Sequence, residues 1–138
     1  PWQLLPYFQA SPYSEPWEAN SVPATKETKE LVQIAAKVAM DKLGENLVAL
    51  DVTEPFALAE VFLVVSATNE RQTQAIADAI EDEFLERKIK ARFREGRQAG
   101  RWILLDFGDL IVHVMHEQER EFYSLERLWS DCPVVSIA

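Results

Sequence analysis

The residues of this chain whose types suggest chemistry are two aspartates and two histidines in its last third. Asp106 and Asp109 flank the dipeptide Phe-Gly, and hard cations such as Mg²⁺ prefer carboxylate ligands. Asp109, however, follows a glycine in a pair typical of hairpin turns, so we interpret it as a turn residue. His113 and His116 lie three positions apart on a predicted strand, so their side chains point to opposite faces and cannot hold one ion together.

The remaining candidate motifs each have a simpler structural explanation. Ser66 follows a predicted strand without the G-x-S-x-G pattern of hydrolases, and Ser66 or Thr68 can cap the next helix. The segment GRQAGR (residues 96–101) matches neither a Walker loop nor a dinucleotide fingerprint, and is typical of a loop. Cys132 is the single cysteine and has no activating neighbour in the sequence. We therefore expect no enzyme activity, no metal and no cofactor.

The charge pattern argues against a protein that coats DNA. The chain of 138 residues has a formal net charge of −9, whereas phosphate binding needs a cationic face. Basic residues gather in one strip between two acidic segments: Lys90, Arg92, Arg94, Arg97 and Arg101. We interpret this strip as ion-paired with the acidic segments, and a contact with nucleic acid is the alternative.

Hydrophobic periodicity predicts the elements that must position these residues. Helices and strands follow in the order α-β-β-α-β-β-β-α, over residues 25–44, 47–52, 61–67, 68–88, 89–95, 101–107, 110–116 and 117–129. Residues 61–67, the helix after them and residues 89–95 fit a parallel crossover, whereas the last two strands add antiparallel. We expect an α/β fold with a mixed sheet of about five strands and flanking helices.

Composition divides the chain into three parts. Residues 1–24 hold five of the seven prolines and no lysine or arginine, which predicts an extended arm whose aromatic side chains pack on an apolar groove. Residues 25–131 form the predicted domain, and residues 132–138 form a C-terminal tail. No apolar run approaches the roughly 20 residues that cross a bilayer, and no signal-peptide pattern appears, so we expect a cytoplasmic protein without membrane contact.

The hairpin around Gly108 and Asp109 has two faces of different character. With these two residues as the turn, one face of the ribbon collects aliphatic side chains and is a predicted core face. The other face is too apolar for solvent and too polar for a sealed core; it holds Trp102, Leu104, Asp106, Ile111, His113 and Met115. Interfaces are enriched in tryptophan and methionine, so this face is either a partner surface or a second core layer covered by a helix.

Long segments of the sequence resemble the ribosomal silencing factor family, also called Iojap-like or DUF143. The matching segments are ALDV (49–52), AEVFLVVSATNERQ (59–72), AIADAIEDE (75–83) and REGRQAGRWILLDFGDLIVHVMHEQEREFYSLERLW (94–129). The last segment is the longest and most specific. The chain departs from the family at Glu60, Val61 and Ala67, where the family more often has Asp, Tyr and Gly.

The resemblance implies a non-enzymatic factor that binds the large ribosomal subunit through its protein fourteen. Association with the small subunit is then blocked and translation is repressed under nutrient limitation, with at most incidental contact with ribosomal RNA. The resemblance also implies a fold distantly similar to nucleotidyltransferases. On these grounds, the residues expected to bind the partner are Arg71, Trp102, Leu104, Asp106, Ile111, His113 and Met115.

Two other functions stay open from the sequence. A nucleotidyltransferase-like enzyme acting on a nucleotide or RNA would use Asp106 and Asp109 as metal ligands. Such an enzyme would melt at a higher temperature with Mg²⁺ and a nucleoside triphosphate, because a ligand bound only to the folded state stabilises it. The apolar hairpin face could instead hold two copies of the chain together as a homodimer.

Overall fold

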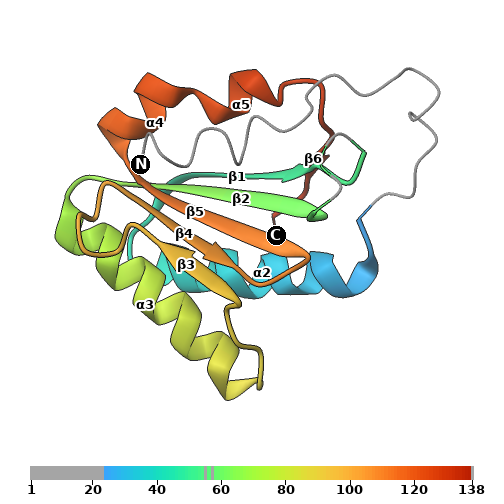
Figure 1. Cartoon of the computed structure of the whole chain (residues 1–138), viewed down its shortest axis with the longest axis horizontal. Helices are drawn as coiled ribbons and strands as arrows, with labels where there is room; N and C mark the ends of the chain where they lie inside the picture. Colours follow the sequence, from blue (N-terminus) through green and yellow to red (C-terminus); the bar gives the residue numbers. More distant parts are fainter. Residues whose placement is uncertain (1–23, 55, 57, 138) are drawn as a thin grey trace.

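The computed structural model describes residues 24–54, 56 and 58–137, which build one sheet with helices on both faces (Figure 1). The strands are β1 (Glu45–Asp51), β2 (Val61–Ala67), β3 (Phe93–Glu95), β4 (Trp102–Asp106), β5 (Leu110–His116) and β6 (Val134–Val135). The helices are α2 (Lys26–Asp41), α3 (Glu70–Glu86), α4 (Glu117–Tyr123) and α5 (Leu125–Leu128). Apart from Ala24, the predicted arm lies outside the described residues.

The strands form a mixed sheet in the order β3-β4-β5-β2-β1-β6. β2 and β5 pair in parallel near the centre, and the other neighbouring pairs are antiparallel. The predicted mixed α/β fold is therefore confirmed. β3 runs in the same direction as β2, as the predicted crossover requires, but β5 and β4 lie between these two strands in the sheet.

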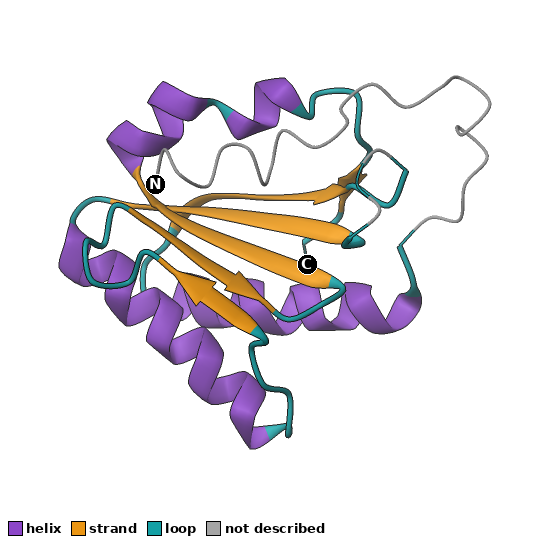
Figure 2. Ribbon diagram, in the orientation of Figure 1, coloured by secondary structure: helices purple, strands orange, loops and turns teal. Residues whose placement is uncertain are grey.

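α2 and α3 pack against one face of the sheet, whose core is mostly aliphatic (Figure 2). α3 is capped at its N-terminus by Asn69, whose side chain accepts a hydrogen bond from the Gln72 N–H at 2.8 Å. It then buries Ile76, Ile80 and Phe84 at the spacing that places side chains on one side of a helix. The strand residues buried in this layer include Leu63, Val65, Ile103, Leu105, Val112 and Val114.

α4 and α5 lie over the opposite face, and they are separate helices rather than the single helix predicted for residues 117–129. Ser124 lies between them in the left-handed region (φ 47°), a conformation in which helices end. The sequence of residues 117–129 predicts one helix with an apolar stripe made of Phe122, Leu125, Leu128 and Trp129. Leu125 and Trp129 are buried, as this stripe predicts, but Phe122 is 80% exposed. The predicted apolar stripe was wrong for Phe122, because the break at Ser124 changes the phase of the helix.

Both edges of the sheet also differ from the prediction. β3 covers only residues 93–95, because the Ile89 N–H still donates to the Phe84 carbonyl in the turn that ends α3. At the other edge, β6 pairs with Ala49 and Leu50 of β1, so the sheet extends into the segment predicted as a tail. Among the described residues, none of the helices is long and apolar enough to cross a membrane.

Candidate functional site

The β4–β5 hairpin has the register that the sequence predicts. Its turn closes with a hydrogen bond from the Phe107 N–H to the Leu110 carbonyl at 2.9 Å, and Gly108 has a φ of 97°, which favours glycine. The strand pairs toward α4 and α5 are Trp102 with Met115, Leu104 with His113, and Asp106 with Ile111. These six residues share one face of the sheet, which we call the second face.

The second face is buried within the chain. None of its six hairpin residues is more than 2% exposed. Leu125 and Trp129 belong to the same buried cluster, and the ring of Tyr123 lies 5.1 Å from that of Trp102 between centroids. In the isolated chain this face is therefore a second core layer, and a partner could reach it only after it has been uncovered.

Trp102 and His113 form a hydrogen-bonded pair near the middle of the second face. The Nε1–H of Trp102 donates to Nδ1 of His113 at 3.1 Å, so the neutral imidazole carries its proton on Nε2. Burial lowers the pKa of His113 to about 3, because desolvation disfavours the charged imidazolium. The pair is thus a fixed, uncharged polar contact within an apolar layer.

A row of ring contacts continues from His113 across the second face. The ring of Phe62 lies 4.9 Å from His113, 5.3 Å from Trp129 and 5.2 Å from Phe56 between centroids, with tilts typical of edge-to-face packing. Phe62 could not be assigned to this site from the sequence, because β2 is apolar at nearly every position and shows no alternation that would distinguish its two faces. Its place follows from the pairing of Phe62 with Ile111.

Two arginines fasten α4 to the rest of the domain. Arg120 is buried and donates from Nη1 to the Ser66 hydroxyl at 2.8 Å, so Ser66 anchors α4 rather than capping α3 as predicted. Arg101 donates to the Glu70 carboxylate at 2.9 Å and to the Glu119 carboxylate at 3.0 Å. The second contact crosses to α4, so the position of this helix depends on specific polar contacts as well as on packing.

The hydrogen bonds of Asp106 and Asp109 are those of residues at a hairpin turn. Asp106 accepts hydrogen bonds from the Gly108 N–H at 2.8 Å and from Nε of Arg92 at 3.0 Å. Asp109 is exposed, and its carbonyl accepts from the Val61 N–H at 3.0 Å. In the described ranges, no three histidine, cysteine, aspartate or glutamate side chains are grouped as a metal site.

The four arginines of the basic strip form ion pairs, largely with α3. Arg94 contacts Glu81 at 2.8 Å, and Arg97 contacts Asp78 at 2.6 Å. The Arg97 guanidinium lowers the pKa of Asp78 by hydrogen bonding to its carboxylate. The interpretation of these arginines as partners of the acidic segments is therefore confirmed for Arg94 and Arg97, and for Arg92 and Arg101 by the contacts above.

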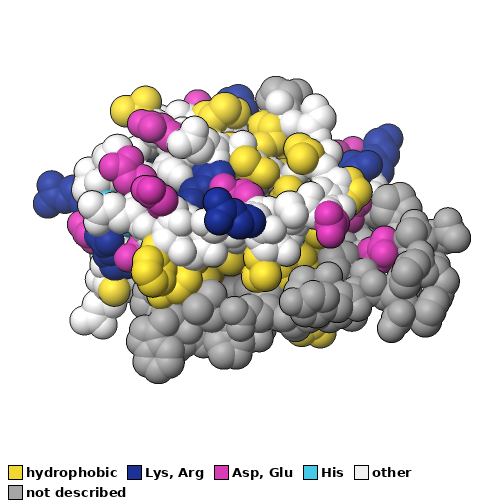
Figure 3. All heavy atoms as spheres, turned by 90° about the horizontal axis from the view of Figure 1, so that it is seen from above, with side chains coloured by type: hydrophobic (Ala, Val, Ile, Leu, Met, Phe, Trp, Pro, Cys, Tyr) yellow, Lys and Arg dark blue, Asp and Glu magenta, His cyan; other side chains and the backbone are white. Residues whose placement is uncertain are grey.

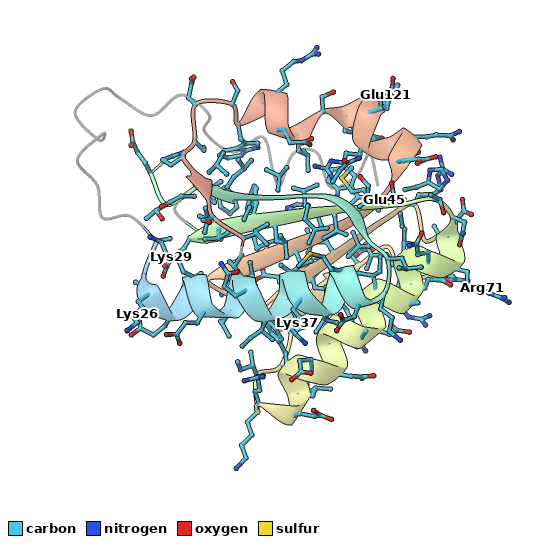
Figure 4. The ribbon with its side chains drawn as sticks, turned by 180° about the vertical axis from the view of Figure 1, so that it is seen from behind. Lys26, Lys29, Lys37, Glu45, Arg71 and Glu121 are labelled. Carbon is cyan, nitrogen blue, oxygen red and sulfur yellow. The ribbon has the colours of Figure 1, made fainter. Side chains whose placement is uncertain are left out.

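Arg71 is the one predicted site residue that does not lie on the second face. It is exposed in the first turn of α3, and its side chain points away from the molecule (Figure 4). The adjacent Glu70 contacts Arg101, which immediately precedes β4. Arg71 therefore lies at the end of the sheet where β4 begins, separate from the buried residues of the hairpin.

Fold and site together define a small mixed α/β domain in which a sheet face lined with aromatic side chains lies under two short helices. Residues 25–138 match the model of a protein family described as "Ribosomal silencing factor during starvation". The chain therefore belongs to the ribosomal silencing factor family, and the resemblance found in the sequence is confirmed.

Several relatives carry names that refer to ribosomes. Ribosomal silencing factor RsfS of Bacillus subtilis is 39% identical over 109 residues, which cover 79% of this chain and 92% of that protein. A crystal structure from Bacillus halodurans has a TM-score of 0.71 at 38% identity and covers 79% of this chain and 99% of its own. Mitochondrial assembly of ribosomal large subunit protein 1 of Mus musculus is 26% identical over 90 residues, which cover 63% of this chain and 40% of that protein.

The family name denotes a regulatory factor of ribosomes rather than an enzyme. Translation regulation and ribosome silencing are thus the role that the comparisons support for this chain. The structural neighbour is a protein of comparable size and fold, because nearly all of it is covered by the match. The distant likeness to nucleotidyltransferases stays a prediction.

Proposed function

We propose that this chain binds the large ribosomal subunit through protein fourteen of that subunit and blocks association with the small subunit. Translation is thereby repressed when nutrients are limiting, in the cytoplasm and without a cofactor. The proposal is supported by the names of the relatives, which refer to ribosome silencing and to assembly of the large ribosomal subunit. The mechanism is steric, because a protein on the docking surface of one subunit excludes the other.

The second face is the proposed contact surface, and its aromatic row is the observation that carries the proposal. Trp102 is flanked by Tyr123 and His113. Central aromatic side chains commonly supply most of the free energy of a protein interface. Because Trp102 and Met115 are fully buried, the proposal requires that the cover of this face moves when the partner binds.

Charge supports a basic protein partner. The formal net charge of the chain is −9, and ribosomal proteins are generally basic, so complementary fields would speed their encounter. Arg71 is exposed near the start of β4 and is proposed to add a polar contact at the rim of the interface. Asp106 would contribute to the second face mainly by accepting the hydrogen bond from the Gly108 N–H that stabilises the turn.

Co-sedimentation tests the proposal directly. The full chain is mixed with isolated large or small subunits, and bound protein is measured in the pellet. We expect binding to large subunits alone, competition by an excess of free ribosomal protein fourteen, and a fall in subunit reassociation measured by light scattering. Equal binding to both subunits, or unchanged reassociation at saturation, would contradict the proposal.

A matched pair of variants tests the proposed surface. Trp102→Phe keeps a ring but removes the hydrogen bond to His113, whereas Phe84→Leu is a similar reduction on the opposite face. We expect Trp102→Phe to weaken binding to large subunits by about tenfold, as substitutions of central aromatic residues do, and Phe84→Leu to leave it within about twofold. If gel filtration shows that the chain is a dimer, loss of the dimer in Trp102→Phe would identify the same face as the homodimer contact.

A further inference from the structure

An open groove of about 870 Å³ lies beside α4, outside the second face. We call it the α4 groove. Asn46 and Ser66 line it from the ends of β1 and β2, and α4 lines it from Glu117 to Phe122. None of the six hairpin residues of the second face is among its lining residues. A ligand in this groove would therefore contact other residues than those of the proposed ribosome contact.

The floor of the α4 groove is fixed by buried polar contacts. Arg120 is 8% exposed, and it donates to the Ser66 hydroxyl at 2.8 Å and to the Glu126 carboxylate at 3.1 Å. These two bonds join α4 to β2 and to α5 at the base of the groove. The other carboxylate oxygen of Glu126, Oε1, is buried and accepts no hydrogen bond from the described residues.

The rim of the groove carries two acidic side chains that form no ion pair with the described residues of the domain. Glu117 and Glu121 lie one turn apart on α4, and neither carboxylate has an ion pair within the described part of the chain. Acidic side chains gather over α4 in Figure 3, and Figure 4 shows Glu45 at the start of β1 at the same end of the molecule as Glu121. Arg127 is a cation on the lining, while Arg120 is paired with Glu126.

An exposed aromatic ring completes the surface. Phe122 lines the groove and is 80% exposed, although its ring packs edge-to-face on Tyr123 at 4.9 Å between centroids. A large apolar side chain held in solvent next to a hollow is a common feature of binding surfaces. A phenyl ring attracts the ammonium of lysine or the guanidinium of arginine and also packs on their aliphatic stems.

From these features we propose that the α4 groove binds an extended, lysine- or arginine-bearing segment of a partner protein. Basic side chains of that segment would pair with Glu117 and Glu121 on the rim of the groove. The Phe122 ring would pack on a neighbouring stem. This contact lies outside the proposed function, because it uses a different surface of the domain.

The test is an NMR titration of the full, ¹⁵N-labelled chain at low salt. The probe is a blocked peptide of sequence Gly-Lys-Leu-Lys-Gly-Lys-Leu-Lys-Gly, with the same peptide bearing glutamate in place of lysine as its control. We expect the lysine peptide to shift the amide signals of Ser66 and Phe122, and the glutamate peptide to shift neither. Equal response to both peptides, or no response to either, would overturn the proposal.

A matched pair of double variants separates the groove from general attraction to an acidic protein. Glu117→Gln with Glu121→Gln removes two charges one turn apart on α4, and Asp82→Asn with Glu86→Gln removes two charges one turn apart on α3. All four side chains are exposed. We expect the α4 variant to weaken peptide binding by about fivefold or more and the α3 variant by less than about twofold. Equal loss in both variants would show that net charge alone attracts the peptide.

Phe122→Ala tests the aromatic part of the surface without disturbing the core, because this side chain is exposed. We expect a several-fold weaker affinity for the lysine peptide and an unchanged melting temperature. Unchanged affinity would overturn the role of Phe122. A single-stranded oligouridylate is the last probe: if it shifts the groove signals, and if the α4 variant binds it more tightly, the groove is a nucleic-acid site and the proposal is wrong.

Discussion

The two faces of the sheet are packed in different ways, although the same strands supply both. Beneath α2 and α3 the core is aliphatic, and Phe84 is its fully buried aromatic residue among those described. Beneath α4 and α5 the core holds Phe62, Trp102 and Trp129 together with the buried, neutral His113. α2 and α3 have 16 and 17 residues, whereas α4 and α5 have 7 and 4.

This difference indicates which layer can rearrange. Long helices that bury continuous aliphatic stripes separate from a sheet only at a large cost in exposed apolar surface. Short helices held by a few polar contacts belong to the less stable parts of a fold, from which moving segments are usually drawn. The layer of α4 and α5 also contains a buried Trp129 Nε1–H that has no acceptor among the described residues. A rearrangement that exposes the second face is therefore expected to start at α4 and α5.

Among the variants that test the difference between the two faces of the sheet, Trp102→Ala is expected to change the free energy of unfolding most. The side chain is fully buried and donates a hydrogen bond to His113, so its removal leaves a cavity and takes away that donor. We expect a loss of about 3–5 kcal/mol in the free energy of unfolding, measured with urea, and about 2–5 kcal/mol for Leu105→Ala on the opposite face. If Trp102→Ala changes stability far less than Leu105→Ala, the second face is not a core layer of the free chain.

The pH dependence of stability tests the buried state of His113. Its pKa is about 3 in the folded chain, well below the ordinary value of 6.5, so the unfolded chain binds a proton between these values and the folded chain does not. The stability that depends on keeping His113 neutral is fully present above pH 6.5 and decreases as the pH falls below this value. Between pH 7.5 and pH 5 we expect a loss of about 2 kcal/mol in urea unfolding. His113→Asn should flatten this slope, and an identical slope in the variant would exclude His113 as its source.

Ser66→Ala is expected to have the smallest effect on the free energy of unfolding. It tests whether polar contacts hold α4 against the sheet. The variant removes the acceptor for Arg120 and leaves a buried guanidinium N–H without that partner. We expect a loss of about 1.5 kcal/mol in the free energy of unfolding and faster hydrogen exchange in α4 than in α3. Ser130→Ala at an exposed position is the matched control, for which no change is expected. Uniformly faster exchange in both helices would contradict a separate role for α4.

Local patterns in the sequence were sufficient to predict the hairpin and the long helices. The strict alternation of residue types on either side of Gly108 and Asp109 assigns each side chain of β4 and β5 to one of the two faces of the sheet. The observed register of the two strands agrees with this assignment. The break between α4 and α5 was not predicted, because it depends on the left-handed backbone of a single residue, Ser124. β6 was missed because two residues are too few to show a period.

The candidate site was predicted in part. Six of its seven residues share a face because strand alternation places them there, whereas Arg71 lies apart on α3. Whether that face is exposed could not be predicted, because its cover comes from segments that are distant in sequence. Phe62 joins the face through a parallel pairing with Ile111, which no local pattern in either strand indicates.

The parallel pairing of β2 with β5 also has a consequence for how the chain folds. The paired residues lie far apart along the chain, as Val61 and Leu110 do, so the centre of the sheet can close only when the chain as far as β5 is available. Contacts between distant segments slow folding, because the intervening chain must be ordered first. During synthesis, β1 and β2 leave the ribosome well before the strand that completes their sheet. The edge of β2 that pairs with β5 therefore stays unpaired until the last third of the protein has been made, and an unpaired strand edge is prone to aggregation.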